Sequence, residues 1–76
     1  MNDAKRKAIT DIVSRVVELK IEIEVLRDEE QAAFDNMPEG LQQSDACQKM
    51  ESAVAAFDAA IDGLDEVEAA LEEAGQ

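Results

Sequence analysis

AVAAFDAAIDGLDEVEAALEEA, residues 53–74, is the stretch that decides the fold of this chain. Divided into groups of seven, it repeats, and each group opens with a small or β-branched residue. The fifth position is large and apolar and the sixth is acidic in every group: Phe57, Leu64 and Leu71 precede Asp58, Asp65 and Glu72. This heptad pattern predicts a helix with an apolar seam beside a row of carboxylates, and such a seam requires a partner helix.

The N-terminal half of the chain supplies a candidate partner helix. Apolar residues recur there at alternating spacings of three and four, interrupted by Glu30: Ile9, Ile12, Val16, Leu19, Ile23, Leu26, Ala33 and Met37. Asn2 or Asp3 can cap the start of this helix. The pattern predicts a helix over about residues 3–36.

A break at residues 37–44 separates the two helices. We expect Asn36 to adopt the left-handed conformation that ends the first helix, and Pro38 to prevent its continuation. Leu41 is expected to pack under the turn. Ser44 or Asp45 can cap a second helix over about residues 45–74, with Gln48 at the capping-box spacing from Asp45.

The predicted fold class is all-α: an antiparallel, coiled-coil-like two-helix hairpin in a single domain, residues 1–76. If the turn centres near Gly40, the numbers of facing residues sum to roughly 80. Opposite charges agree with that alignment, which predicts these pairs: Arg27 with Glu51, Lys20 with Asp58, Arg15 with Asp65, Lys49 with Glu30, and Lys5, Arg6 and Lys7 with Glu72 and Glu73.

A chain of 76 residues buries little core alone, so staples, metals or self-association are expected. One cysteine, Cys47, and no histidine exclude an internal disulfide and a structural zinc site. A second apolar row on the first helix and small residues on the second therefore predict a homodimer that forms a four-helix bundle. The predicted interface consists of Val13, Val17, Ile21, Val25, Ala56, Ala60 and Gly63.

The net charge of −12 is unevenly distributed. Residues 1–27 carry +1 and residues 28–76 carry −13. This charge disfavours direct binding to nucleic acid or anionic membranes and favours a basic or nucleic-acid-binding host protein as partner. Carboxylates beyond the predicted internal pairs gather at the turn, and we expect this acidic tip to bind the partner: Asp28, Glu29, Asp35, Glu39 and Asp45. No membrane span or signal peptide is visible, so we expect a cytoplasmic location.

The sequence contains no constellation typical of an enzyme, a metal site or a cofactor site. Asp58–Gly63 resembles the start of a calcium loop, but alanine occupies the third and twelfth positions, where oxygen ligands are required. A di-iron bundle requires histidines, which are absent. Cys47 lies in the first turn of the second helix, where a buried apolar role is favoured over a reactive thiol. We therefore expect no catalytic residues, no metal and no cofactor.

The segment from Asp28 to Asp45 and the heptad helix after it resemble small acidic helical-hairpin proteins of phages, prophages and their bacterial hosts. The resemblance covers about two-thirds of the chain and rests on these residues: Glu29, Glu30, Gln31, Phe34, Asn36, Pro38, Glu39, Leu41 and Gln42. That family has no activity to transfer. It implies a small phage accessory protein, and such proteins often bind and inhibit host defence or regulatory proteins.

Two functions remain open from the sequence. The first is a non-enzymatic protein-binding module: a phage-type inhibitor or modulator of a host protein that acts through an acidic helical surface, in one form as a nucleic-acid mimic. The alternative is a structural oligomeric component with no external target. Binding of a small anionic nucleotide is disfavoured, because only Lys5, Arg6 and Lys7 form a cationic cluster.

Overall fold

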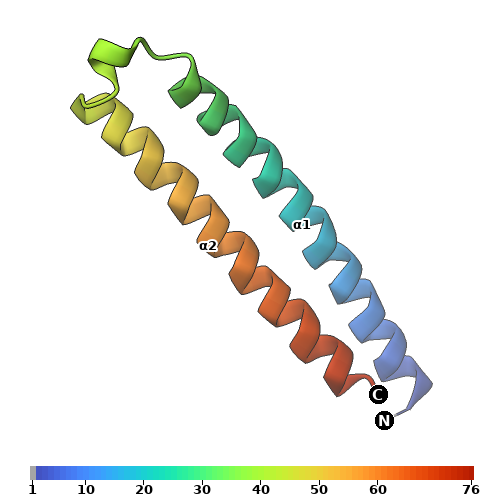
Figure 1. Cartoon of the computed structure of the whole chain (residues 1–76). Helices are drawn as coiled ribbons and strands as arrows, with labels where there is room; N and C mark the ends of the chain where they lie inside the picture. The colour runs from blue at the N-terminus through green and yellow to red at the C-terminus, as the bar shows by residue number, and fades with distance from the viewer. Residues whose placement is uncertain (1) are drawn as a thin grey trace.

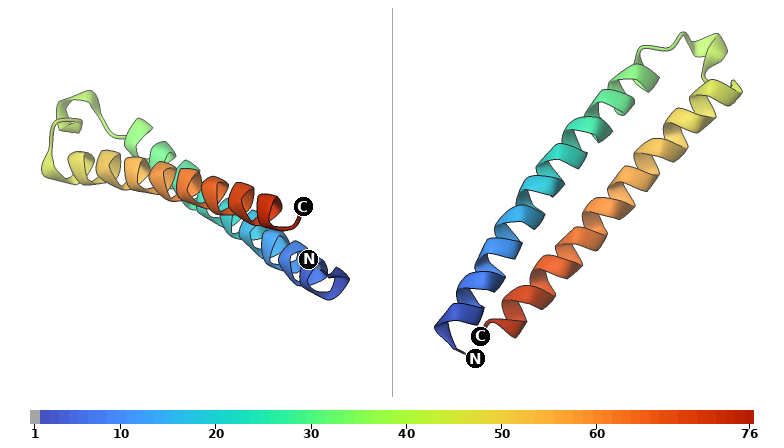
Figure 2. Two further views of the ribbon diagram at one scale, coloured as in Figure 1. Left: turned by 90° about the horizontal axis from the view of Figure 1, so that it is seen from below. Right: turned by 180° about the vertical axis from the view of Figure 1, so that it is seen from behind.

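The computed structural model describes residues 2–76, which form two long antiparallel helices joined by a short turn (Figure 1). Helix α1 spans Asp3–Asp35 and helix α2 spans Asp45–Ala74, with a short 3₁₀ helix, η1, at Glu39–Leu41 between them. The molecule measures 59 × 15 × 12 Å. The helices stay side by side over most of their length and cross at a shallow angle (Figure 2). The predicted all-α hairpin is confirmed.

Both helices begin at a side-chain cap that the sequence allows. The Asn2 carboxamide oxygen accepts a hydrogen bond from the backbone N–H of Lys5 at 2.8 Å, and the Ser44 hydroxyl accepts one from Cys47 at 3.3 Å. Each cap satisfies a backbone donor that the first helical turn leaves free. The capping box predicted at Asp45 is absent, because the Gln48 side chain donates to the carbonyl of Gln43 instead.

The turn differs from the prediction in two respects. Asn36 keeps a right-handed conformation, with φ of −85°, and its N–H bonds to the carbonyl of Ala32. The chain leaves the helix at Pro38, whose extended backbone starts η1, so no left-handed residue is needed. Leu41 is 50% exposed, because the 3₁₀ turn directs it to solvent rather than under the tip.

The register of the hairpin also differs from the prediction. Lys20 pairs with Asp65 and Arg27 pairs with Asp58, so the numbers of facing residues sum to about 85 rather than 80. The register differs because α2 extends past the C-terminal end of α1. The first residues of α2 therefore lie beside the turn and not beside the last turn of α1. At the open end Gly75 lies next to Ile9, and the first turn of α1 extends past the end of α2 (Figure 1).

The shift in register removes the predicted ion pairs. Among residues 2–76, Arg15, Lys49, Lys5 and Lys7 form no ion pair, and Arg6 pairs with Asp3 in its own helix. Within the same residues, three ion pairs join the helices: Lys20 with Asp65, Lys20 with Glu68, and Arg27 with Asp58. Asp65 and Asp58 each lie one heptad beyond the residue predicted to pair with Lys20 and Arg27. The charges therefore form cross-helix pairs in an antiparallel register, but one that the assumed turn centre did not give.

The core between the helices is thin. Of residues 2–76, only Val16, Cys47 and Val54 are buried. The remaining inward positions are partly exposed and follow heptad spacing on each helix: Ile9, Val13, Lys20, Ile23, Arg27, Glu30 and Phe34 on α1, and Met50, Phe57, Ile61, Leu64, Glu68 and Leu71 on α2. Cys47 is fully buried, in agreement with its predicted apolar role.

Two charged residues displace part of the predicted seam of α1. Ile9, Val16, Ile23 and Glu30 face α2 as expected, but the positions between them belong to Val13, Lys20, Arg27 and Phe34. Ile12, Leu19 and Leu26, predicted to lie in the seam, are turned outward. Compared with the prediction, α1 is rotated about its axis so that Lys20 and Arg27 face α2. This orientation allows both cations to pair with carboxylates of α2.

This arrangement gives the hairpin two unlike long sides, one on each flank of the core. The polar side carries Thr10, Val17, Glu24 and Gln31 of α1 and Glu51, Asp58, Asp65 and Glu72 of α2. The apolar side carries Ile12, Leu19, Leu26 and Ala33 of α1 and Ala53, Ala60, Val67 and Ala74 of α2.

Candidate protein-binding site

Lys20 is the centre of the polar side. It occupies an inward position of α1, and its side chain is only 18% exposed. Its ammonium donates to Asp65 at 2.7 Å and to Glu68, which is itself an inward residue of α2. These hydrogen bonds, the one to Asp65 first, hold the pKa of Lys20 above its usual range. The lysine is the shared counter-ion of two carboxylates in the middle of the hairpin, and this cluster keeps one net negative charge.

Arg27 repeats this arrangement one heptad closer to the turn. Its Nε donates to Asp58 at 3.0 Å, and an Nη donates to Asp28 at 3.3 Å. Hydrogen bonding to Asp58, and then to Asp28, raises the pKa of Arg27. With Lys20, this arginine partly offsets the charge of four carboxylates in the middle of the hairpin: Asp28, Asp58, Asp65 and Glu68.

The structure leaves the predicted acidic tip exposed to solvent. Asp28, Glu29 and Asp35 lie on the last two turns of α1, Glu39 opens η1, and Asp45 opens α2. Asp28 is partly neutralised by Arg27, and Asp35 accepts a hydrogen bond from Gln31 at 2.9 Å. Glu29, Glu39 and Asp45 form no ion pair with residues 2–76. The tip thus presents carboxylates that the hairpin itself does not use.

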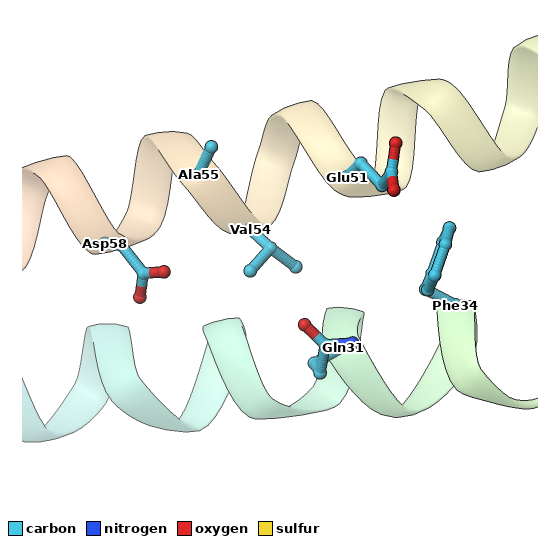
Figure 3. A pocket seen from close by; sticks show the side chains of 6 residues that line it. All are labelled: Gln31, Phe34, Glu51, Val54, Ala55 and Asp58. Carbon is cyan, nitrogen blue, oxygen red and sulfur yellow. The ribbon is translucent and has the colours of Figure 1, made fainter.

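A cleft opens on the polar side next to this tip, with a volume of about 270 Å³. Its lining residues come from both helices: Gln31 and Phe34 from α1, and Glu51, Val54, Ala55 and Asp58 from α2. Figure 3 shows Val54 and Asp58 of α2 and Gln31 and Phe34 of α1 pointing into the gap between the helices, with the Glu51 carboxylate beside its own helix near the end of Phe34. The register of about 85 creates this cleft, because it places Phe34 level with Glu51.

The chemistry of the cleft matches a cationic side chain. Glu51 forms no ion pair with residues 2–76 and supplies a free carboxylate. The Gln31 amide nitrogen is bound to Asp35, which leaves its oxygen as an acceptor toward the cleft (Figure 3). Phe34 and Val54 provide an apolar surface for an aliphatic stem, and an aromatic face attracts a cation. Arginine and lysine have this combination of stem and charge.

Sequence reasoning did not identify this cleft. Glu51 was assigned to Arg27, and the assumed register placed Phe34 away from Glu51. The spacing of the charges does not reveal the observed register, because Lys20 and Arg27 are seven residues apart and match Asp58 and Asp65 no better than Glu51 and Asp58.

The structure divides the predicted oligomer interface. Val13 and Val17 are half-buried, whereas Ile21 and Val25 are exposed. Steps of four residues advance about 40° beyond a full turn, so this row winds away from the core and does not form one face. Ala56, Ala60 and Gly63 are exposed together on α2, where Ala60 belongs to the apolar side and the other two border it.

The rest of the described hairpin offers few groups for binding or catalysis. No group of three or more His, Cys, Asp or Glu side chains in residues 2–76 is placed to hold a metal ion. A second cleft, at the open end between Arg6, Thr10 and Glu72, also lies on the polar side. Neither helix, over the residues described, has the length and apolar character to cross a membrane. No protein-family model, curated protein or solved structure matches the chain.

Proposed function

We propose that this chain is a non-enzymatic protein-binding module that engages a basic surface of another protein through its acidic tip and the adjoining cleft. The observation that carries the proposal is a group of carboxylates at and beside the cleft that have no counter-ion in the hairpin. Glu29, Glu39, Asp45 and Glu51 have no ion-pair partner among residues 2–76, whereas Asp58, which also lines the cleft, is paired with Arg27. Unpaired carboxylates on rigid helices attract and orient a cationic partner.

The cleft gives this attraction a specific contact. An arginine or lysine of the partner can lay its aliphatic stem on Phe34 and Val54 and direct its charge to Glu51 and the Gln31 amide oxygen. The carboxylates of the tip then attract basic side chains of the partner around this contact, over longer distances. A partner with a row of basic side chains can therefore be recognised at one fixed point and held by several weaker charges.

The concrete form of the proposal is an inhibitor or modulator of a host defence or regulatory protein, of the kind that phages encode. Basic grooves that bind nucleic acid are the natural targets of such a surface, because carboxylates on a slender rod can take the place of phosphates. The hairpin then acts as a nucleic-acid mimic by occupying the groove. The resemblance of the turn segment to phage-associated proteins supports this form, and a cytoplasmic location follows from it.

A charge-reversal experiment tests the proposal. The triple variant Asp28→Lys, Glu29→Lys and Asp35→Lys alters the tip. A matched triple variant, Asp62→Lys, Glu66→Lys and Glu73→Lys, makes the same change of net charge on exposed positions of α2. Capture of host proteins from lysate is measured with both, at low and high salt and with DNA as competitor.

We expect the unaltered chain to capture a basic, nucleic-acid-binding protein that salt and DNA release. The tip variant should lose at least tenfold in affinity, and the α2 variant should lose less than threefold. The single variant Glu51→Gln should weaken binding more than Glu73→Gln does. Equal losses in the two triple variants would contradict a defined site, because they would show dependence on net charge alone.

A structural oligomeric component is the second candidate function. It is favoured by the exposed apolar side, because monomeric proteins rarely expose a continuous apolar surface. The same capture experiment separates the two candidates. Absence of any salt-sensitive partner, together with stable self-association, would favour the structural role.

A further inference from the structure

The apolar side is the largest feature that the proposed function does not use. Leu19, Leu26 and Val67 are 48%, 49% and 45% exposed, and Ala60 lies among them. In the observed register Leu19 lies level with Val67 and Leu26 with Ala60. The side is therefore continuous from one helix to the other. An apolar surface of this length on a soluble protein is normally covered by a partner.

The exposed area fits a protein–protein interface. A compact protein of 8.3 kDa has an accessible surface of about 4,600 Å², whereas this chain exposes 5416 Å². The excess is close to the ~800 Å² that one partner buries in an interface of standard size. With only three buried side chains in the described part of the chain, the hairpin has more core to gain from a partner than it has already formed.

The pattern along the apolar side is nearly symmetric about its middle, so a twofold axis placed there brings apolar residues of one copy onto apolar residues of the other. On α2, Ala56 and Ala70 lie at equal distances on either side of Gly63, and Ala60 and Val67 nearly so. On α1, Leu19 and Leu26 are centred between residues 22 and 23. With facing numbers that sum to about 85, these two centres lie at the same level of the hairpin.

Gly63 marks the centre of that symmetry. A glycine inside a helix costs about 1 kcal/mol relative to alanine. Nothing within the hairpin requires it, because a Cβ built there meets no atom within 4 Å. A glycine at this point allows two α2 helices to approach closely, each at the Gly63 of the other.

The charges at the two ends decide the orientation. Lys5 and Lys7 lie in the turn of α1 that extends past α2, and they form no ion pair with residues 2–76. The opposite end carries the acidic tip. Two copies with their tips at the same end would bring like charges together. Two copies turned end for end place Lys5 and Lys7 of one beside Glu39 of the other.

We propose that a second copy of this chain, turned end for end, covers the apolar side, so that α1 packs on α1 and α2 on α2 in a four-helix bundle. In this arrangement Leu19 of each copy lies beside Leu26 of the other. Arg15, unpaired in the hairpin, comes beside Glu29 of the second copy. Glu22 comes beside its own counterpart at the exposed rim, where salt weakens their repulsion. The acidic cleft remains open on the opposite side.

The substitution Gly63→Gln tests the close approach of the two α2 helices. Glutamine favours a helix more than glycine does, so a loss of dimer cannot be attributed to a loss of helix. Ala59→Gln, on the outward face of α2, is the matched control. Analytical ultracentrifugation should show a dimer for the unaltered chain, at least tenfold weaker for Gly63→Gln and changed less than twofold for Ala59→Gln. A monomer for the unaltered chain at micromolar concentration, or equal effects of the two substitutions, would overturn the proposal.

Distance measurement tests the orientation. A spin label at Glu39→Cys, in a chain with Cys47→Ala, reports the separation of the two tips, with circular dichroism confirming that the chain is folded. End-for-end packing predicts a separation near the full 59 Å length of the hairpin. A short separation would overturn it. Glu22→Gln should tighten the dimer two- to fivefold. Because Gly63→Gln leaves the acidic tip unchanged, failure of dimerisation and failure of partner binding are observed separately.

Discussion

On the polar side of the hairpin, two cations of α1 reach across to carboxylates of α2, whereas on the apolar side leucines of α1 lie beside alanines of α2. The ion pairs and hydrogen bonds that join the two helices within residues 2–76 all belong to the first of these sides. Apolar contacts tolerate sliding along the helix axis, but a hydrogen-bonded pair does not. The polar side therefore fixes the register, and the apolar side is free to make contacts outside the hairpin.

The difference also explains why charged residues occupy inward positions in so small a core. Lys20 and Glu68 are both inward residues, and a heptad with leucine at both would bury more apolar area. Such a hairpin could pair in several registers, because alanine-rich rows offer little to distinguish one heptad from the next. A polar pair at one inward layer specifies alignment at some cost in stability, as it does in coiled coils.

The substitution expected to have the largest effect is Lys20→Glu. It removes both hydrogen bonds from the ammonium and places a third carboxylate beside Asp65 and Glu68. We expect Tm to fall by roughly 10 °C or more, because the remaining carboxylates lose their counter-ion in a half-buried layer. Thermal unfolding followed by circular dichroism measures the change.

Lys49→Glu is the matched control for that substitution. It makes the same change of charge at an exposed residue with no ion-pair partner within the described hairpin. An exposed charge of this kind contributes about 0–1 kcal/mol, so Tm should change by only a few degrees. Similar losses in both variants would show that net charge, and not the Lys20 layer, governs stability.

An alkaline titration gives a smaller and reversible version of the same test. The pKa of Lys20 is raised in the folded state from an ordinary value of 10.5. Folding then favours the protonated lysine, so its contribution to stability is complete below about pH 10.5 and is lost as pH rises through the folded-state pKa. Tm is measured from about pH 9 to pH 12 for the unaltered chain and for Lys20→Met.

The difference in Tm between the two chains should be constant up to about pH 10 and should narrow above that. The Lys20→Met variant lacks the titrating group, so the decline of its Tm with pH reports the ionisation of the other groups. A difference that stays constant to pH 12 would contradict the assignment of the shift to Lys20.

Much of the hairpin could be predicted from the sequence because helices are encoded locally. The period of apolar residues, the caps at Asn2 and Ser44, and Pro38 in the turn each act within a few residues. They placed the end of the first helix within one residue of Asp35. Burial of Cys47 followed from its heptad position for the same reason.

The register and the cleft could not be predicted in this way, because they depend on contacts between distant residues. The assumed sum of 80 differed from the observed sum of about 85, which displaced the predicted partners of Lys20 and Arg27 by one heptad and separated Phe34 from Glu51. The prediction admitted only apolar residues to the seam, so it missed Lys20 and Arg27 as inward residues and assigned Leu19 and Leu26 to the core. The predicted outer row of α1 consisted of residues outside that seam, and one of them, Val13, lies at an inward position.

The smallest expected effect compares two carboxylates of the same row on the polar side, Asp65 and Glu72. Asp65 is paired with Lys20, and Asp65→Asn should lower stability by about 0–1 kcal/mol, because the carboxylate is half exposed and Glu68 remains. Glu72 has no ion-pair partner among residues 2–76, and it lies in the last turn of α2, where negative charge opposes the helix dipole. Glu72→Gln should therefore raise stability by about 0.3–1 kcal/mol. The two substitutions remove the same charge. If the changes in the free energy of unfolding, measured in urea, have opposite signs, the row contains carboxylates that hold the register and carboxylates that the fold does not need. Equal shifts of the same sign would remove that distinction.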